Sequence, residues 1–353
     1  MSQQHRELLE KAAHKLPELE YRTWFFGDST GFEAMLRASE VLSTPRLEDF
    51  AYGWFRAWAT RSVPYRRDDC TAPGLAIVLA AERHNNQELL NAAVGLADYL
   101  TTRNKHLDVY ETFDQSPLME PYSGEQLPER EKELLANPPA GVFIDCLHFD
   151  PPFFASLARV TGDSRWEREA ISQAEGYIGA LQQESGLFNH FVLRDVPDES
   201  FGPGWGRGQG WALLGLLDVV EQLNLDHRSS VAGAATRLIR AMLLLQREDG
   251  HWPVNILEAN SGDEPSTAAF MVTGFLRAVR LGLVAHSEVE QAVSAALSAI
   301  VKDTTDDGYL SGVSRAVMAS TRPSHYSHVP RGFNVPWGQG PLVLALCEVE
   351  TYG

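Results

Sequence analysis

Cysteine is scarce in this chain of 353 residues, which contains only Cys70, Cys146 and Cys347. A sparse, odd set without CxxC spacing argues against a disulfide framework and against a structural zinc site. The polar first residues lack the apolar core of a secretory signal, and no apolar stretch approaches the roughly 20 residues of a membrane span. We therefore expect a cytoplasmic protein with reduced thiols and no membrane partner.

Basic residues are also few, with 30 Lys and Arg against 47 Asp and Glu and a net charge of −17. The densest basic spot is Arg66-Arg67, and no run of five basic residues occurs. Because nucleic-acid binding relies on clustered Lys and Arg, we expect no nucleic-acid partner. An anionic substrate would need a local cation to hold it against the field of the whole chain.

Alternating strand patterns are scarce, and apolar residues recur mainly at helical spacing. We predict an all-α protein, an (α/α)6 barrel of six helical hairpins. An open solenoid is the alternative, but its repeats should be more regular and should end in polar capping repeats. The prediction rests on six segments that open with a small residue or a proline and continue into an apolar helix: 31–36, 73–79, 151–157, 208–214, 266–271 and 338–344.

No linker divides the chain, so residues 1–353 are predicted to form one catalytic barrel domain. An irregular insertion at about 105–140 contains five prolines and many acidic residues. Long insertions of this kind in compact domains are usually functional loops or lids, and the equally weighted alternative is a solvated surface excursion. A second irregular stretch, 320–336, contains His325 and His328.

The richest local signal is the segment Gly204-Trp205-Gly206-Arg207-Gly208-Gln209-Gly210-Trp211. The indole faces of Trp205 and Trp211 can stack on sugar rings, and the Arg207 guanidinium can hold a carboxylate. A helix beginning here adds a field that favours an anion. The alternative is a Trp-rich packing turn with Arg207 on the surface. We favour a substrate site, because an arginine between glycines has little structural purpose.

Asp145 follows the apolar run 141–144 and precedes the pair Pro151-Pro152. A carboxyl group in apolar surroundings keeps its proton to a higher pH and can therefore act as a general acid. The alternative is a helix-capping residue, but Asp150, immediately before the prolines, suits that role better. We predict that Asp145 is catalytic.

Asp69 precedes the inner helix of another predicted hairpin, as Asp145 does. In a ring of hairpins, equivalent positions line the same mouth, so the two carboxylates can converge. Paired carboxylates are the usual apparatus for cleaving glycosidic bonds. Taken alone, Asp69 is more simply explained as a helix cap.

Several single residues carry weaker signals. His190 follows a glycine turn and is expected to face the mouth, while Trp24 and Trp337 precede repeat openings, where they can stack on substrate. His148 can be a partner of Asp145, although a hydrogen-bonded core histidine is the simpler interpretation. The chain has no phosphate loop, dinucleotide motif, HExxH or EF-hand pattern, and we therefore predict no metal site.

Together these motifs resemble glycoside hydrolase families 88 and 105, the unsaturated glucuronyl and rhamnogalacturonyl hydrolases, from about Trp24 to the C-terminus. The segment 205–211 matches their WxRGxGW pattern, which is fairly specific. Less specific matches are found at several other places: Ile144-Asp145, Asp69 with Gly74, the turn 186–190, and the closing segments 337–340 and 344–348.

The resemblance implies an enzyme that removes a non-reducing-end 4,5-unsaturated uronic acid from an oligosaccharide. In such enzymes an Asp protonates C4, water adds at C5, and the hemiketal collapses to release the neighbouring sugar, without metal or cofactor. Carried over, Asp145 is the acid, and Asp69 maintains its protonation state and helps to place the substrate. The remaining motif residues would hold the substrate: Arg207, His190, Trp205 and Trp211.

Two segments depart from the family pattern, because the stretch 105–142 is longer than usual and 141–149 replaces a tryptophan-containing segment. The linkage and the neighbouring sugar therefore stay open, as does the choice between monomer and homodimer. One alternative is another (α/α)6-barrel sugar enzyme, such as a saturated uronide hydrolase or an N-acylhexosamine 2-epimerase type. A non-catalytic glycan-binding or scaffold protein is a further alternative. The epimerase type needs two histidines facing the barrel centre, for which four are available: His148, His190, His251 and His325.

Overall fold

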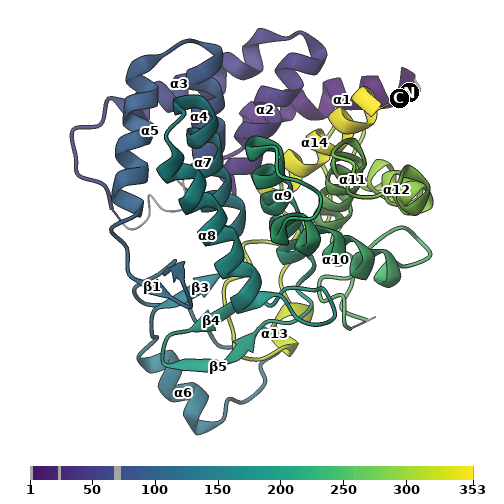
Figure 1. Ribbon diagram of the computed structural model, residues 1–353. Helices are drawn as coiled ribbons and strands as arrows, with labels where there is room; N and C mark the ends of the chain where they lie inside the picture. Colours follow the sequence, from purple (N-terminus) through teal and green to yellow (C-terminus); the bar gives the residue numbers. More distant parts are fainter. Residues whose placement is uncertain (1–2, 23–24, 67–72, 259, 353) are drawn as a thin grey trace.

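The computed structural model describes residues 3–22, 25–66, 73–258 and 260–352. Helices dominate this part of the chain, and Figure 1 shows them stacked above a smaller region of strands and irregular segments. Within the described residues, no helix combines the length and the apolar character that crossing a membrane requires.

Six helices form an inner ring, and each packs against the next one along the chain. The last inner helix packs against the first, so the ring is closed. This closure confirms the predicted (α/α)6 barrel and excludes the open solenoid. The inner helices are α2 (Asp28–Leu42), α4 (Gly74–Arg83), α7 (Cys146–Thr161), α9 (Gly206–Leu223), α11 (Pro265–Arg280) and α14 (Pro336–Tyr352).

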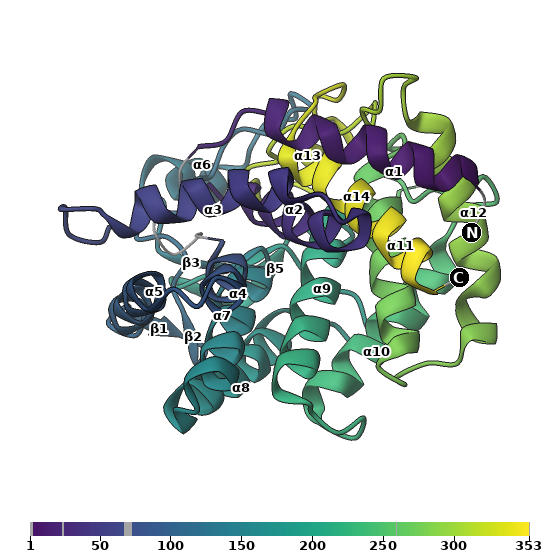
Figure 2. The ribbon, with the colours of Figure 1, turned by 90° about the horizontal axis from the view of Figure 1, so that it is seen from above.

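Six further helices surround the ring, and Figure 2 shows them outside the inner set. They are amphipathic, with one apolar stripe against the inner ring and a polar face to solvent. The outer helices are α1 (Gln3–Lys15), α3 (Pro45–Ala59), α5 (Gln87–Leu100), α8 (Ser164–Leu181), α10 (Ser230–Leu245) and α12 (His286–Asp303).

The inner helices are buried on nearly all sides, as their continuous apolar and small residues require. In α9 every residue from Gly206 to Val220 is buried. A Cβ atom at Gly215 would lie only 2.2 Å from the carbonyl oxygen of Leu147, so this glycine permits the close approach of α9 to α7.

Two small antiparallel sheets lie beyond the amino-terminal ends of the inner helices. One pairs β1 (Lys105–His106) with β2 (Val109–Tyr110), and the other has the order β3-β4-β5. In Figure 1 both sheets lie at one end of the barrel, together with the short helices α6 and α13. The bounds of these elements are β3 (Gly141–Phe143), β4 (Phe191–Leu193), β5 (Val196–Phe201), α6 (Glu129–Ala136) and α13 (Ser324–Ser327); the one-turn helix η1 (Leu16–Glu18) follows α1.

The insertion 105–140 contains β1, β2 and α6 and packs against the second irregular stretch, 320–336. Arg322 binds Glu125 through its Nε atom at 2.8 Å and Glu131 through Nη1 at 3.1 Å. Residues 118 and 319 form an isolated parallel bridge. Two regions that the sequence marks as irregular therefore form one layer over the mouth of the barrel.

Candidate active site

Asp145 lies at the junction between β3 and the inner helix α7. The amide of Ile144 donates a 2.8 Å hydrogen bond to the carbonyl oxygen of His190, which extends the β3–β4 ladder by one residue. Asp145 is the residue before α7, but its side chain makes no capping hydrogen bond. The carboxylate is therefore available for another role.

The expectation that Asp150 caps this helix is wrong, because α7 begins four residues earlier and includes both prolines. Asp150 is buried within the helix and accepts a 2.7 Å hydrogen bond from Arg103. The prolines remove the amide hydrogens that would bond the carbonyls of Leu147 and His148. The helix persists through them because neighbouring inner helices hold both of its sides.

A narrow pocket of about 80 Å³ opens beside Asp145, and its walls are mainly aromatic and apolar. Asp145 is the only carboxylate among the lining residues, and its side chain is 15% exposed. Three residues of the insertion and residues 317 and 318 complete the walls. The insertion therefore contributes to the site. The lining residues are Phe26, Thr112, Phe113, Pro117, Phe143, Asp145, Cys146, His190, Trp205, Val317 and Met318.

His190 lies next to Asp145 in this pocket, as the sequence suggests. Its Nε2 atom is 3.5 Å from Oδ2 of Asp145, and its Nδ1 atom is 2.7 Å from the hydroxyl oxygen of Tyr326. The Trp205 ring lies 4.4 Å from the imidazole, centroid to centroid. The structure thus brings together three of the predicted residues, which come from segments about 15 to 60 residues apart.

Arg207, whose guanidinium was expected to meet the substrate, does not line this pocket. The side chain is fully buried, and Nη1 donates to the Ser314 hydroxyl at 2.8 Å while Nη2 donates to the Arg315 carbonyl at 2.7 Å. Glu264 lies 3.6 Å from Nη1. The guanidinium therefore holds a loop rather than a ligand in this structure.

Trp211 is likewise fully buried, so its ring cannot stack on a sugar. It packs among Phe26, His148, Phe149 and Phe270, with ring centroids 4.9 to 6.4 Å apart. The reason is helical geometry: Trp211 lies one and a half turns beyond Trp205, deep inside the ring.

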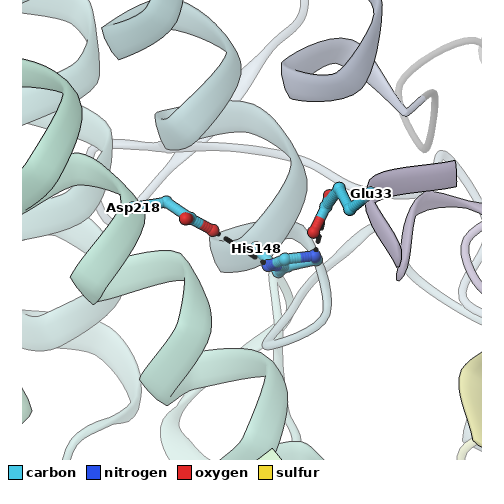
Figure 3. Close-up of side chains that lie close together, drawn as sticks. All are labelled: Glu33, His148 and Asp218. Carbon is cyan, nitrogen blue, oxygen red and sulfur yellow. Dashed lines mark ion pairs between the residues drawn. The ribbon is translucent and has the colours of Figure 1, made fainter. Parts of the chain in front are cut away.

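His148 faces the interior of the barrel rather than Asp145, which agrees with the simpler of its two interpretations. Figure 3 shows its ring between two carboxylates, with Nε2 3.2 Å from Glu33 and Nδ1 3.7 Å from Asp218. Burial alone lowers the pKa of His148, but Glu33 and Asp218 outweigh burial and raise it above its ordinary value. Arg277 also contacts Asp218.

These three side chains could offer ligand atoms to a metal ion. However, the two ring nitrogens of His148 point to different carboxylates, and the Arg277 guanidinium already neutralises Asp218. The geometry is that of an ion-pair chain that joins α2, α7, α9 and α11.

Trp337 is the second residue of the last inner helix and lines a second cleft of about 300 Å³ beside the pocket. Its ring stacks on Phe26 with centroids 5.3 Å apart, and Phe26 forms a wall of the first pocket. The second cleft also presents two guanidinium groups, from Arg22 and Arg315. Asp69 and Trp24, both predicted site residues, lie outside the described residues.

The histidine pair that an epimerase-type site needs does not form. His251 pairs with Asp303 at 2.7 Å, and His325 bonds the carbonyl of Val317 at 2.8 Å. His148 is held as described above, so among these four histidines only His190 lines the pocket.

Sequence reasoning missed several residues of the site. Tyr326 lies in a stretch that drew notice only for its histidines, and Arg315 lies in a loop without a pattern. The aromatic walls at Phe26, Phe113 and Phe143 resemble ordinary core residues in sequence. The available signal in the sequence is proximity: Phe26 lies two residues after Trp24, and Phe143 lies two residues before Asp145.

Comparison with known proteins places these observations in a family. The family model described as Glycosyl Hydrolase Family 88 matches residues 3–352. An unsaturated 3S-rhamnoglycuronyl hydrolase of Alteromonas sp. (strain LOR) is 27% identical over 216 residues, 58% of this chain and 50% of that protein. The unsaturated rhamnogalacturonyl hydrolase YesR of Bacillus subtilis (strain 168) is 24% identical over 214 residues, 60% of each chain. The matches thus span about half to three fifths of these relatives.

Solved structures share the fold over the full length. A possible GH105 member from Salmonella enterica superimposes with a TM-score of 0.81 at 20% identity, covering 99% of this chain and 94% of that one. An unsaturated glucuronyl hydrolase from Bacillus sp. GL1 gives 0.73 at 18% identity, covering 99% and 97%. With a family model that extends over nearly all of its residues, the chain belongs to glycosyl hydrolase family 88.

Proposed function

We propose that this protein is a glycosidase that releases a 4,5-unsaturated uronic acid from the non-reducing end of an oligosaccharide. The observation that carries the proposal is Asp145, the one carboxylate that the described residues contribute to a mainly aromatic pocket, with an imidazole 3.5 Å away. Family membership and the activities for which the relatives are named support the same chemistry.

Asp145 supplies the proton in this reaction. Its carboxyl group protonates C4 of the unsaturated ring, and positive charge develops at C5 and the ring oxygen. A water molecule adds its oxygen to C5 and returns a proton to Asp145. The resulting hemiketal opens to an α-keto acid, and the neighbouring sugar leaves with its glycosidic oxygen protonated. Proton delivery and return by one side chain is general acid–base catalysis and uses groups that this chain itself provides.

The pocket walls suit a flat, half-unsaturated ring. The faces of Trp205 and Phe143 lie beside His190 and offer stacking surfaces, with Phe143 5.4 Å from the imidazole. The buried indole N–H of Trp205 has no hydrogen-bond partner in the described structure, so it is free to donate to a ring hydroxyl or to the uronate. Such unpaired buried donors are costly unless a ligand uses them.

The second cleft is the proposed place for the leaving sugar. Trp337 and Phe333 offer rings, and the guanidinium of Arg315 forms no ion pair with the described residues. Arg22 lies 3.4 Å from Glu20 at the same cleft. These guanidinium groups are the local cations that an acidic chain needs for an anionic substrate, a role for which the sequence suggested Arg207.

Other predicted properties remain proposals. Asp69 would maintain the protonation state of Asp145, and Trp24 would stack on substrate. A cytoplasmic location is supported by the three sparse cysteines. The chain would act as a monomer or a homodimer.

The test is turnover of lyase-generated unsaturated disaccharides, followed by the loss of the ultraviolet absorbance of the conjugated double bond. Pectin-type, heparin-type and ulvan-type fragments form the panel. Asp145→Asn should lower kcat by at least about 1,000-fold while leaving the thermal transition in place. Asp98→Asn, an exposed residue on α5, is the matched control and should keep full activity. No absorbance loss across the panel would refute the proposed activity, and an active Asp145→Asn variant would refute the assignment of the acid.

A further inference from the structure

Tyr326 contacts the imidazole beside the proposed acid from the side opposite to Asp145. Its hydroxyl oxygen lies 2.7 Å from Nδ1 of His190, and both side chains are buried. The two nitrogens of His190 thus have different neighbours, a phenol on Nδ1 and a carboxylate on Nε2. In a neutral imidazole one nitrogen donates and the other accepts, so the phenol can select the tautomer.

The other neighbours of the phenol oxygen bear on the direction of this hydrogen bond. The backbone amide of Ser320 interacts with the phenol oxygen, which occupies an acceptor position there. Burial raises the pKa of Tyr326 well above its ordinary value, so the phenol keeps its hydrogen at neutral pH. The hydroxyl group can therefore donate its hydrogen to Nδ1 of His190.

The backbone at residues 201 and 202 leaves room for the contact between Tyr326 and His190 and also holds His190 in place. Gly202 has φ of +67°, and a Cβ atom there would lie 2.3 Å from the Tyr326 hydroxyl and 2.6 Å from Cβ of His190. A larger residue at this position would separate the two rings. The amide of His190 in turn donates a 2.8 Å hydrogen bond to the carbonyl of Phe201, next to Gly202.

The insertion fixes the short helix α13 that carries Tyr326. The amide of Tyr122 donates to Nδ1 of His325 at 3.3 Å, and the two rings stack with centroids 4.6 Å apart. Ser324 donates to Glu125 at 2.6 Å. These contacts come from the two residues immediately before Tyr326, so the insertion holds the helix that carries the phenol.

We propose that Tyr326 is a positioning residue that fixes His190 in the Nε2–H tautomer and so directs an N–H donor at the Asp145 carboxylate. This inference rests on the proposed function of Asp145. The His190 donor stabilises the carboxylate that remains after proton delivery and keeps its oxygen aimed into the pocket. The insertion, through α13, is then part of the apparatus that orients the acid.

The experiment is ¹⁵N NMR of histidine-labelled protein, with His190→Gln used to assign the His190 signals. Wild-type protein should show the Nε2–H pattern at pH 7, and Tyr326→Phe should show a mixture of tautomers. Tyr177→Phe, which removes a buried phenol oxygen from the outer helix α8, is the matched control and should leave His190 unchanged. An Nδ1–H pattern in the wild type, or an unchanged pattern in Tyr326→Phe, would overturn the inference.

Kinetics then separate positioning from simple destabilisation. Tyr326→Phe should lower kcat about 10- to 100-fold with little change in KM, as second-layer changes typically do. A Tyr326→Phe protein with wild-type kcat would contradict the inference even if the NMR pattern changed. The NMR measurement requires no substrate and therefore does not depend on turnover. If the wild-type protein is inactive, the proposed function is refuted, while the NMR spectrum still decides the tautomer of His190. If Tyr326→Phe does not fold, the wild-type spectrum alone decides.

Discussion

Nη2 of Arg207 donates a 2.7 Å hydrogen bond to the carbonyl oxygen of Arg315, a residue more than 100 positions further along the chain. The buried guanidinium thereby fixes the backbone from which the Arg315 side chain reaches the second cleft. The first arginine holds the loop, and the second is left without an ion pair among the described residues. This placement differs from the expectation that the guanidinium of the WxRGxGW segment lies open to the substrate.

Replacing Arg207 should therefore cost stability. Arg207→Gln removes a fully buried charge, leaves the buried Glu264 carboxylate without its ion-pair partner, and removes a donor from the carbonyls of residues 314 and 315. We expect a loss of about 3–5 kcal/mol in the free energy of unfolding, as for other broken buried ion pairs. Urea denaturation of the variant and the wild type measures this difference. Arg240→Gln on the outer surface should change stability by less than about 0.5 kcal/mol. Equal stability of the two variants would contradict the structural role.

The His148 ion-pair chain predicts a pH dependence of stability. The folded-state pKa of His148 is raised by Glu33 and Asp218, so folding is favoured while the imidazole is charged. This contribution is fully present below about pH 6.5 and is lost as pH rises through the higher folded-state pKa. The thermal transition of the wild type should therefore fall between pH 6.5 and 9.

The comparison for this prediction is His148→Gln, which removes the imidazole of His148 and keeps the other titrating groups, Asp28 among them. It should be less stable than the wild type at pH 6, and the difference should shrink as pH rises. A difference that grows with pH would show that the imidazole is neutral in the folded protein.

Asp28 in the first turn of α2 gives a separate prediction, because burial raises its pKa to about 8. For an acid whose folded-state pKa is raised, stability is present at low pH and is lost as pH rises through that value. Between pH 7 and 9 the loss amounts to about 1.4 kcal/mol for this group. Asp28→Asn should remove that part of the decline, measured by urea denaturation at both pH values. An unchanged decline would mean that the carboxyl titrates alike in folded and unfolded chains.

Local patterns were sufficient to predict the fold. Helical spacing and the small or proline residues at six apolar segments indicate the hairpins, although in α2 and α7 these residues lie inside the helix rather than at its start. Six hairpins of this kind can close into a ring. Asp145 and Trp205 were predicted for a related reason, because each lies immediately before an inner helix, and in a barrel these ends share one mouth. His190 was predicted from the glycine turn that precedes it.

The errors have physical causes that lie outside the local sequence. Arg207 is two residues from Trp205, and whether its guanidinium meets a ligand or a loop depends on residues 314 and 315, over 100 positions away. Tyr326 reaches His190 only because the insertion packs on α13. Such contacts depend on tertiary docking of irregular segments, for which the sequence offers no periodic signal.

The last prediction concerns the charge of the sugar that leaves. Arg315 lines the second cleft with Arg22, Trp337 and Phe333, and it forms no ion pair with the described residues. A sulfate or carboxylate on the leaving sugar would gain a charge-assisted hydrogen bond there, which is stronger than a neutral one. Arg315→Gln should raise KM about 10-fold for such a substrate and leave KM unchanged for an unsaturated uronide with a neutral leaving sugar. Arg228→Gln, at the opposite end of the barrel, removes the same charge and should affect neither substrate. Equal effects of Arg315→Gln on both substrates would show that the guanidinium acts through the loop rather than on an anionic group, because only direct contact distinguishes the two sugars.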